Sequence, residues 1–434
     1  MFTAGRRAAD DAVVGTETKG GPASAGKHGP GDRVASVEPN GSGSTTPRAH
    51  AKAPARLVEL DGLRGLAALS VVCYHWLLTD PAVAVGPATG SLTSGMNWLN
   101  GTPLRALVAG PEMVLLFFVL SGMVLSLPRL AGRGVSYGRF LFARAMRLYP
   151  AAWAVTAIAL LGLLVEPTHT ETASSTIWLA REFAAPIRSL DAFHYVALIF
   201  PFDPTRLDGP LWSLELELRA CVLLPLLVWL VCRCGSRIAF VAAVALIVHG
   251  TTASLVQTSW IWTEVVIGCF LLGILLARHR DSLNHAWAGA STSVRRLAGL
   301  AILMSFWLPT RGIDGRVGSL PIGYLVTILG ACALIVAAQG PRTGGWLSGR
   351  VPAWLGRISY SLYLVHTVVL KLLVTAAPAG TPPIALAPAG IAISLALATL
   401  LQRAVEAPAI RLAKTAWTTR RPQFAIWRRF SLRA

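Results

Sequence analysis

The chain has 434 residues, of which 54% are hydrophobic and only 14% are charged, and its mean hydropathy is +0.56. A soluble domain of this size could not bury so much apolar surface, so the composition excludes a soluble globular protein and predicts a polytopic membrane protein. The net charge of +18, with an isoelectric point near 10.6, would suggest a nucleic-acid partner in a soluble protein, so the position of the charges along the chain decides between these classes.

The N-terminal segment, residues 1–55, is rich in Gly, Ala, Ser, Pro and Thr, with scattered Arg and Lys and no apolar stretch long enough to pack. This composition is typical of a disordered basic tail. The tail also lacks the continuous apolar core of a cleavable signal peptide, so we expect the first apolar segment after it to direct insertion into the membrane.

Apolar runs then follow one another to the end of the chain. Several are nearer fifteen residues than the roughly 20 that a membrane-spanning helix needs. The ten runs are residues 63–79, 111–128, 149–165, 211–232, 238–256, 260–277, 297–309, 319–338, 354–375 and 385–405. A further segment, Phe193–Phe202, is too short to cross, and we expect it at the membrane interface. The predicted fold is therefore an all-α integral membrane protein with about ten transmembrane helices.

Basic residues gather in alternate connections between these runs. The connection 80–110 carries Arg105 as its one basic residue, whereas the next carries five arginines: Arg129, Arg133, Arg139, Arg144 and Arg147. The alternation continues along the chain, and by the positive-inside rule it predicts ten crossings with both termini in the cytoplasm. Most of the +18 charge thus marks the topology of a multi-pass protein of the cell membrane, and we expect no nucleic-acid partner.

Two further segments complete the predicted organisation. Residues 56–411 form the membrane domain, and residues 412–434 form a C-terminal tail in which Arg and Lys alternate with aromatic residues. A short helix lying on anionic lipid and simple disorder are both compatible with that tail.

The stretch Glu59–Leu78 places charged residues at the mouth of an apolar run and a histidine inside it. Arg64 and His75 are eleven residues apart, which at about 100° per residue returns to within roughly 20° of the same helix face. The rise of roughly 16 Å puts His75 near the membrane middle when Arg64 lies at the water boundary. An ionisable group at that depth favours a cavity or pathway, and the alternative is a histidine satisfied by a neighbouring helix.

The cysteines show no metal-type or disulfide-type spacing, so we expect neither a disulfide framework nor a metal site. Cys73 lies two residues from His75, about 200° around the helix, so its thiol points away from the histidine.

Polar residues interrupt several other apolar segments. Ser121 and Gly122 lie in the run 111–128, where small residues let helices approach closely. Arg144 and Arg147 share a helix face immediately before the run 149–165, as functional residues or as ordinary topology signals.

Carboxylates and aromatic residues mark the two remaining segments. Glu215 and Glu217 are about 200° apart on a helix, so at most one faces a given cavity, and the alternative places both at the outer interface. Tyr363 is three residues from both Tyr360 and His366, which describes either a functional polar stripe or interhelical hydrogen bonding.

Six motifs, taken together and in this order, resemble those of the membrane-bound acyltransferase-3 family. They are LDGLRGLAALSVVCYH, FFVLSGMVL, RAMRLYP, LWSLELE, ISYSLYLVH and VEAPAIR, from residue 60 to residue 411. Members of that family transfer acyl groups to sugars, glycolipids, glycans and antibiotics. Some of them carry a soluble domain after the last helix; the residues after 411 leave no room for one, so we expect the membrane core to handle the acceptor.

The resemblance also implies site residues. The family's basic residue and histidine, separated by ten positions, match Arg64 and His75. Its arginine pair matches Arg144 and Arg147, and its glutamate after Trp-Ser-Leu matches Glu217. The motif here continues Glu-Leu-Glu-Leu-Arg in place of the usual glutamate pair and aromatic residue, which leaves the role of Glu217 open. The candidate supporting residues are Asp61, Ser121, Trp212, Ser213, Tyr363 and His366.

Transfer of an acyl group from a thioester to a hydroxyl needs a base for the hydroxyl proton, and a neutral imidazole with a pKa near 6.5 can take it at pH 7. We predict that His75 is this base and that Glu217 is a second candidate catalytic residue. Arg64, Arg144 and Arg147 suit the phosphates of coenzyme A, so acyl-CoA is the expected donor substrate, with no tightly bound cofactor. A transient acyl-histidine is the variant mechanism.

The expected partners are acyl-CoA, the lipid bilayer and a hydroxylated acceptor such as a glycan, a glycolipid or a macrolide-type molecule. Two other functions compete with this prediction. A secondary transporter would also place ionisable groups at the membrane middle, but it should show matching broken helices in two halves, and no such repeat is visible. A catalytically inactive protein that binds glycans or acyl-lipids would have lost the base, and His75 is present.

Overall fold

The computed structural model describes residues 57–80, 102–133, 135–165, 176, 179, 193, 195–198, 208–253, 259–308, 321–378 and 380–416. By internal contacts the chain divides into two units, Met1–Ala55 and Arg56–Ala434, and every described residue belongs to the second. The predicted N-terminal tail, half of the predicted interfacial segment Phe193–Phe202 and the chain from residue 417 lie outside the described residues.

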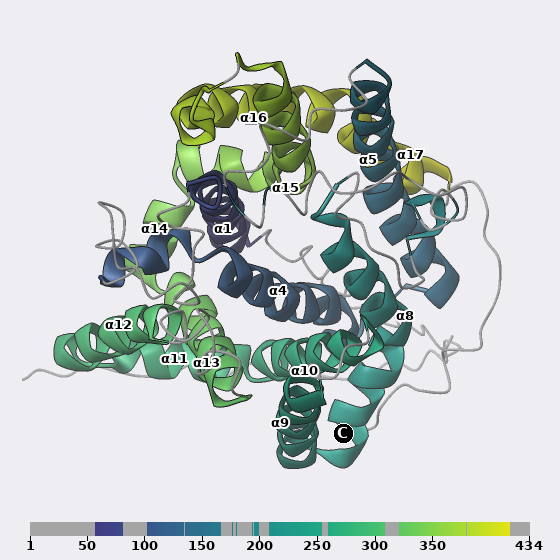
Figure 1. The fold of residues 1–434 in the computed structure, drawn as a ribbon. Helices are drawn as coiled ribbons and strands as arrows, with labels where there is room; N and C mark the ends of the chain where they lie inside the picture. Colours follow the sequence, from purple (N-terminus) through teal and green to yellow (C-terminus); the bar gives the residue numbers. More distant parts are fainter. Residues whose placement is uncertain are drawn as a thin grey trace, which may run out of the picture. The chain divides into compact units, whose positions relative to one another are not determined.

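Every regular element in these ranges is a helix, which confirms the predicted all-α class (Figure 1). The elements are α1 Val58–Leu77, η2 Pro103–Val108, α4 Gly110–Leu130, α5 Tyr137–Val165, α8 Leu211–Cys234, α9 Ser236–Ala253, α10 Ser259–Arg278, α11 Arg280–Gly289, α12 Thr292–Trp307, α13 Pro321–Ala338, α14 Pro341–Leu347, α15 Arg350–Ala376, η7 Pro383–Leu386, α16 Ala387–Leu401, η8 Gln402–Glu406 and α17 Ala407–Ala416. Each of the ten predicted apolar runs falls on one or more of them.

Six helical segments of the described chain are long and apolar enough to cross a membrane. They are Gly110–Leu130, Tyr137–Gly162, Ser236–Ala253, Pro321–Ala338, Arg350–Ala376 and Pro383–Ala416, and the pair α10 and α11, bent by 70°, would make a seventh. Three other helices on predicted runs fall outside this class. α1 and α8 carry several charged residues, and α12 has only 16 residues. Multiple candidate spans are thus present, and the total of ten stays a prediction.

Helix α5 begins at Tyr137, well before the predicted start at residue 149, and continues through Pro150. The helix tolerates this proline because neighbouring helices in a membrane protein can satisfy the backbone group that proline leaves unpaired. Arg144 and Arg147 therefore lie inside a candidate membrane span and not before it.

Among the described helices, the most extensive contact joins α1 to α15 (Figure 1). Glycines allow it: a Cβ atom on Gly65 would lie 2.3 Å from the Gly356 backbone nitrogen, and one on Gly356 would lie 2.3 Å from the Asp61 carbonyl oxygen. Small residues at such contacts let two backbones approach closely. Because residues further along α1 meet residues further along α15, the two helices run parallel.

The buried apolar side chains form two clusters. One joins α4 with α9, α10 and α13, and the other joins α15 with α5 and α16. In the first cluster Gly122 permits a close contact as expected, since a Cβ atom there would lie 2.5 Å from the Phe270 carbonyl oxygen. α1 and α8 contribute side chains to both clusters, so the helices that carry His75 and Glu217 lie between them.

Candidate active site

His75 and His366 are in direct hydrogen-bond contact across the α1–α15 seam. Nε2 of His366 lies 3.0 Å from Nδ1 of His75, and the ring centroids are 4.9 Å apart. His75 occupies the last turn of α1, whereas His366 lies well inside α15 and is 0% exposed. The two histidines are 291 residues apart in the sequence, and the close packing of α1 and α15 at their glycines brings them together.

Backbone carbonyls fix the direction of hydrogen bonding in this histidine pair. Nδ1 of His366 lies 3.3 Å from the Leu362 carbonyl oxygen, so it donates, and Nε2 of a neutral His366 ring must then accept. Nδ1 of His75 lies 3.0 Å from both the Val71 carbonyl oxygen and this accepting Nε2, so it carries the proton. The neutral His75 ring consequently has its lone pair on Nε2, as a base requires.

Arg64 occupies the same seam nearer the start of α1. Its Nε donates to Ser359 Oγ at 3.1 Å, and its guanidinium lies 3.7 Å from Asp61. The side chains of Arg64 and Asp61 remain 30% and 21% exposed. Arg64 and His75 therefore both face α15, in agreement with the predicted shared face.

Glu217 forms the centre of a second polar group. It accepts a hydrogen bond from Ser121 Oγ at 3.1 Å and pairs with the guanidinium of Arg144, so α4, α5 and α8 converge on one carboxylate. The side chains of Arg144 and Glu217 are only 12% and 20% exposed. Separating the two side chains would leave a mostly buried charge without its partner, which is costly. The pair therefore holds Arg144 in a defined position.

Glu215 points elsewhere, as the helical spacing predicts. It pairs with Arg219 one turn along α8, and Arg219 Nη1 donates to Thr263 Oγ1 at 2.8 Å. Both charged side chains of this second pair are at most 6% exposed. The two carboxylates thus have separate partners, and Glu217 is the one that reaches the predicted arginine.

Arg147 lies between charges of both signs. Arg64, Arg144, Glu217 and Glu406 all act electrostatically on its guanidinium, yet Arg147 donates no hydrogen bond within the described part of the chain. Its five N–H groups therefore remain able to bind an anion such as a phosphate.

Glu406 was not among the predicted site residues. It is 3% exposed, accepts a hydrogen bond from Ser361 Oγ at 2.9 Å and ends the π-helix Gln402–Glu406. π-Helical turns are rare in proteins, and those that occur are often found at functional sites. The available signal was its place in the VEAPAIR motif, directly after the apolar run 385–405.

Tyr363 connects the histidine pair to α8. Its ring centroid lies 5.9 Å from that of His366, and its hydroxyl lies 2.8 Å from Ser213 Oγ. The charge of Glu217 also acts on Tyr363, so the two polar groups are neighbours. Trp212, by contrast, is 37% exposed and packs on Trp262 at 6.3 Å between ring centroids, with no described contact to either group.

The structure therefore brings together nearly all of the predicted residues around α1, α5, α8 and α15. A search of the described residues for three or more His, Cys, Asp or Glu side chains able to share a metal ion finds none. What the arrangement offers is an oriented imidazole, a group of arginines and a paired carboxylate inside a helical membrane protein.

These features define an integral membrane protein with a polar site enclosed by apolar helices. Comparison with known proteins identifies the class, because residues 57–403 match the acyltransferase domain of the acyltransferase-3 family. The chain belongs to this family of membrane acyltransferases, which confirms the resemblance drawn from the motifs and favours an enzyme over a transporter.

A curated relative gives a more specific likeness. The chain is 25% identical over 355 residues to the Bacillus subtilis (strain 168) protein named "Putative peptidoglycan O-acetyltransferase YrhL". The match covers 74% of this chain and 50% of the relative, so the chain spans about half the length of that protein. No solved structure matches the chain.

Proposed function

We propose that this protein transfers an acyl group from acyl-CoA to a hydroxyl of a carbohydrate-containing acceptor, with His75 as the general base. The observation that carries the proposal is the contact between His366 and His75, because it leaves the lone pair of a neutral His75 on Nε2. A positioned base of this kind typically contributes about 10² to 10⁴ in rate.

The reaction follows from that orientation. Nε2 of His75 takes the proton of the acceptor hydroxyl while the oxygen attacks the thioester carbonyl carbon. The carbon–sulfur bond then breaks, and the leaving thiolate of coenzyme A receives the proton from the His75 imidazolium. His366 accepts a hydrogen bond from His75 Nδ1 throughout and so stabilises the charged ring.

The arginines supply the donor site in this proposal. Arg147 donates no hydrogen bond to a described residue, and Arg64 and Arg144 lie close enough for their charges to act on it. Phosphates of coenzyme A are the expected ligands of such a group, because charge-assisted bonds from guanidinium to phosphate are strong and directional. Glu217 holds the Arg144 guanidinium in place beside Arg147, so Glu217 is a positioning residue of the donor site.

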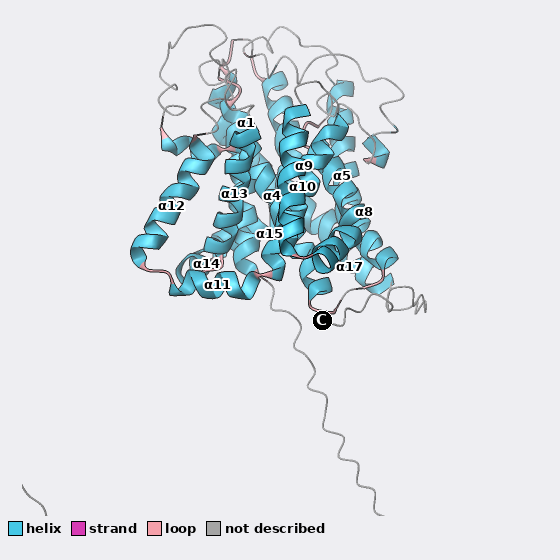
Figure 2. Cartoon of the chain, turned by 90° about the horizontal axis from the view of Figure 1, so that it is seen from below, coloured by secondary structure: helices cyan, strands magenta, loops and turns pink. Residues whose placement is uncertain are grey.

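The acceptor class is supported by the relative, whose name assigns it to peptidoglycan. We extend to this chain the broader class, a glycan or another hydroxylated carbohydrate. The helical packing agrees with the predicted alternation of crossings: α1 and α15 run parallel, as the predicted first and ninth spans should. In addition, α11 and α14, which follow the predicted sixth and eighth spans, lie at the same end of the helices (Figure 2).

Radiolabelled acyl-CoA added to membranes that contain the protein tests this function. We expect the label to move to an added glycan acceptor as an alkali-labile ester, and a macrolide acceptor tests the antibiotic alternative. Membranes that carry the protein and transfer label to neither class would contradict the proposal.

A further inference from the structure

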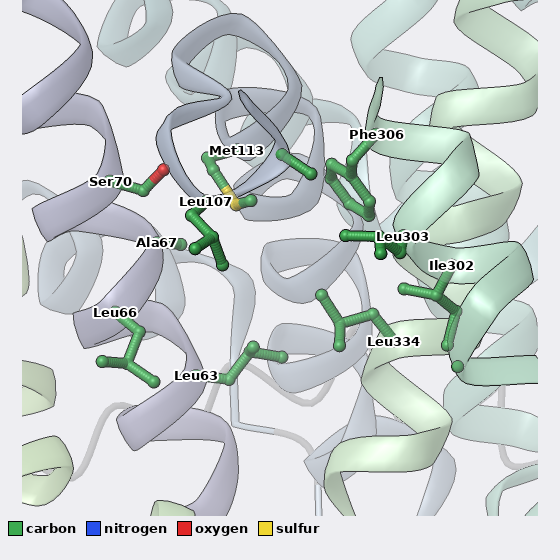
Figure 3. A pocket seen from close by; sticks show the side chains of 12 residues that line it. Leu63, Leu66, Ala67, Ser70, Leu107, Met113, Ile302, Leu303, Phe306 and Leu334 are labelled. Atoms are coloured by element: carbon green, nitrogen blue, oxygen red, sulfur yellow. The ribbon is translucent and has the colours of Figure 1, made fainter. Parts of the chain in front are cut away.

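A cavity of about 320 Å³ lies on a different face of α1, between α1, η2, α4, α12 and α13 (Figure 3). Ser70 and His75 are five residues apart, so their side chains leave α1 at directions about 140° apart. The cavity thus does not belong to the acyl-transfer site. Its wall is apolar, with Leu66, Leu107, Met113 and Phe306 among the lining residues, and Ser70 supplies the one hydroxyl among the described residues that line it.

Ser70 has an unmet hydrogen-bonding requirement. The residue is 7% exposed, and its Oγ is buried without a hydrogen-bond partner among the described residues. A serine inside a helix usually bonds back to a carbonyl of the preceding turn, and buried hydroxyls in folded proteins are nearly always paired. Figure 3 shows this hydroxyl directed from α1 toward the cavity, with Leu63 at the opposite end of the lining. A ligand that offers one acceptor at the Ser70 end would satisfy it.

The mouth of the cavity lies on the apolar outer surface of the helices. Leu107 lines the cavity and is 66% exposed, and Gly299 of α12 lines it from an exposed position. The adjoining face of α12 is also apolar, with Leu297 68% exposed and Leu300 53% exposed. In a membrane protein we expect such an apolar surface to face lipid, so the cavity would open toward the bilayer.

We propose that this cavity binds one acyl chain of a bilayer ester lipid, whose ester carbonyl accepts a hydrogen bond from Ser70 Oγ. The chain lies against the apolar wall of the cavity, which extends roughly 10 Å along α1 by helix rise. None of the described residues that line the cavity is charged, so none of them offers a charge to the phosphates of an acyl-CoA. The lipid therefore comes from the membrane and is distinct from the donor substrate.

A phospholipid that carries a photoreactive diazirine in one acyl chain provides the test. The full chain in lipid nanodiscs is irradiated, and the labelled peptides are mapped by mass spectrometry. We expect enrichment of label on the cavity-facing residues Leu303 and Phe306 over exposed Phe240 and Val241 of α9. Equal labelling of the two groups would show ordinary lipid contact and overturn the proposal.

Two variants and a matched control sharpen the result. Gly299→Phe should reduce cavity labelling to background, since a Cβ atom there meets no atom within 4 Å and the ring can extend into the cavity mouth. Gly138→Phe, an equally open and exposed helical position on α5, should leave it unchanged. Ser70→Ala removes one hydrogen bond, so unlabelled phospholipid should compete about two- to tenfold less well.

A parallel experiment with acyl-CoA as the probe distinguishes the two sources of an acyl chain, a bilayer lipid and the donor substrate. A diazirine-bearing acyl-CoA should label the cavity no more than the α9 surface. Preferential labelling by acyl-CoA, or unchanged competition in Ser70→Ala, would contradict the assignment of this cavity to an ester lipid. Because Ser70→Ala removes only one buried oxygen atom, it decides the question even where Gly299→Phe prevents folding.

Discussion

Nε2 of His366 lies 3.0 Å from Nδ1 of His75, and this contact couples the orientation of the proposed base to a second, buried imidazole. His366 is itself held by the Leu362 carbonyl oxygen, one turn earlier in α15. The chain of hydrogen bonds therefore starts from the backbone of one helix and ends at a side chain of another. Each link reduces the number of orientations and tautomers open to His75.

His366→Ala should lower kcat less than loss of His75, because it removes the orienting partner and keeps the base. His366→Gln should recover part of the loss, since its amide oxygen can accept the bond from His75 Nδ1. KM for acyl-CoA should stay near the parent value in both variants. A larger kcat loss in His366→Ala than in His75→Ala would assign the base to α15 instead.

Arg147→Ala and Arg144→Ala should each weaken acyl-CoA binding by about 1.5 to 3 kcal/mol, the usual range for a hydrogen bond to a charged group. Arg147 should show the purer binding effect, because its N–H donors are not occupied by described residues. Lysine at either position should restore binding only in part, since it lacks the planar fork of N–H groups.

Equilibrium binding of radiolabelled acyl-CoA to the purified variants measures these differences. Arg139→Ala, on the same helix but before the polar site, is the matched control and should bind as the parent does. An arginine whose alanine variant binds acyl-CoA as tightly as the parent protein is a topology signal and not a donor ligand.

Substitutions of the two glutamates of α8 should differ in their effects on activity, although both should lower the stability of the protein. Glu217→Gln should reduce activity, because it loosens Arg144 beside the donor site, whereas Glu215→Gln should act on stability alone. Breaking either pair leaves a mostly buried arginine charge, which typically costs about 3 to 5 kcal/mol. Unfolding midpoints in detergent, measured beside kcat and KM, distinguish the effects, and an activity loss confined to Glu215→Gln would reverse the assignment.

Topology can be measured with single cysteines in a background freed of the native ones. The arginine distribution predicts Arg139 and Arg350 on the cytoplasmic side and Gly95 and Pro382 outside. Gly95 lies outside the described residues, so this experiment also reports on a part of the chain that the structure does not describe. An impermeant thiol reagent on intact cells should label Gly95→Cys and Pro382→Cys alone, and any other division means that a span was miscounted.

Hydropathy located the helices because each apolar run must form internal hydrogen bonds in lipid. It misplaced the start of α5, since Pro150 and two arginines resemble a boundary until the partner of Arg144 on α8 is known. Helical periodicity correctly separated Glu215 from Glu217, which is a property of one helix. The His75–His366 contact depends on how two helices pack, and no local pattern in either helix predicts that.

Glu406 shows a second limit of sequence reasoning. A π-helical turn shifts the register of the side chains around it, so periodicity counted along α16 and α17 does not predict which way a residue at that turn points. The Ser361 contact and the field on Arg147 became visible only in the folded chain.

The central claim, that His75 is the base for acyl transfer, is tested most directly by His75→Ala in purified protein with radiolabelled acyl-CoA and a glycan acceptor. Transfer should fall at least about 100-fold, while acyl-CoA binding and the amount of folded protein stay close to the parent values, because the base acts on the acceptor proton and not on the donor phosphates. Retention of more than about a tenth of the parent rate would contradict the assignment of His75 as general base.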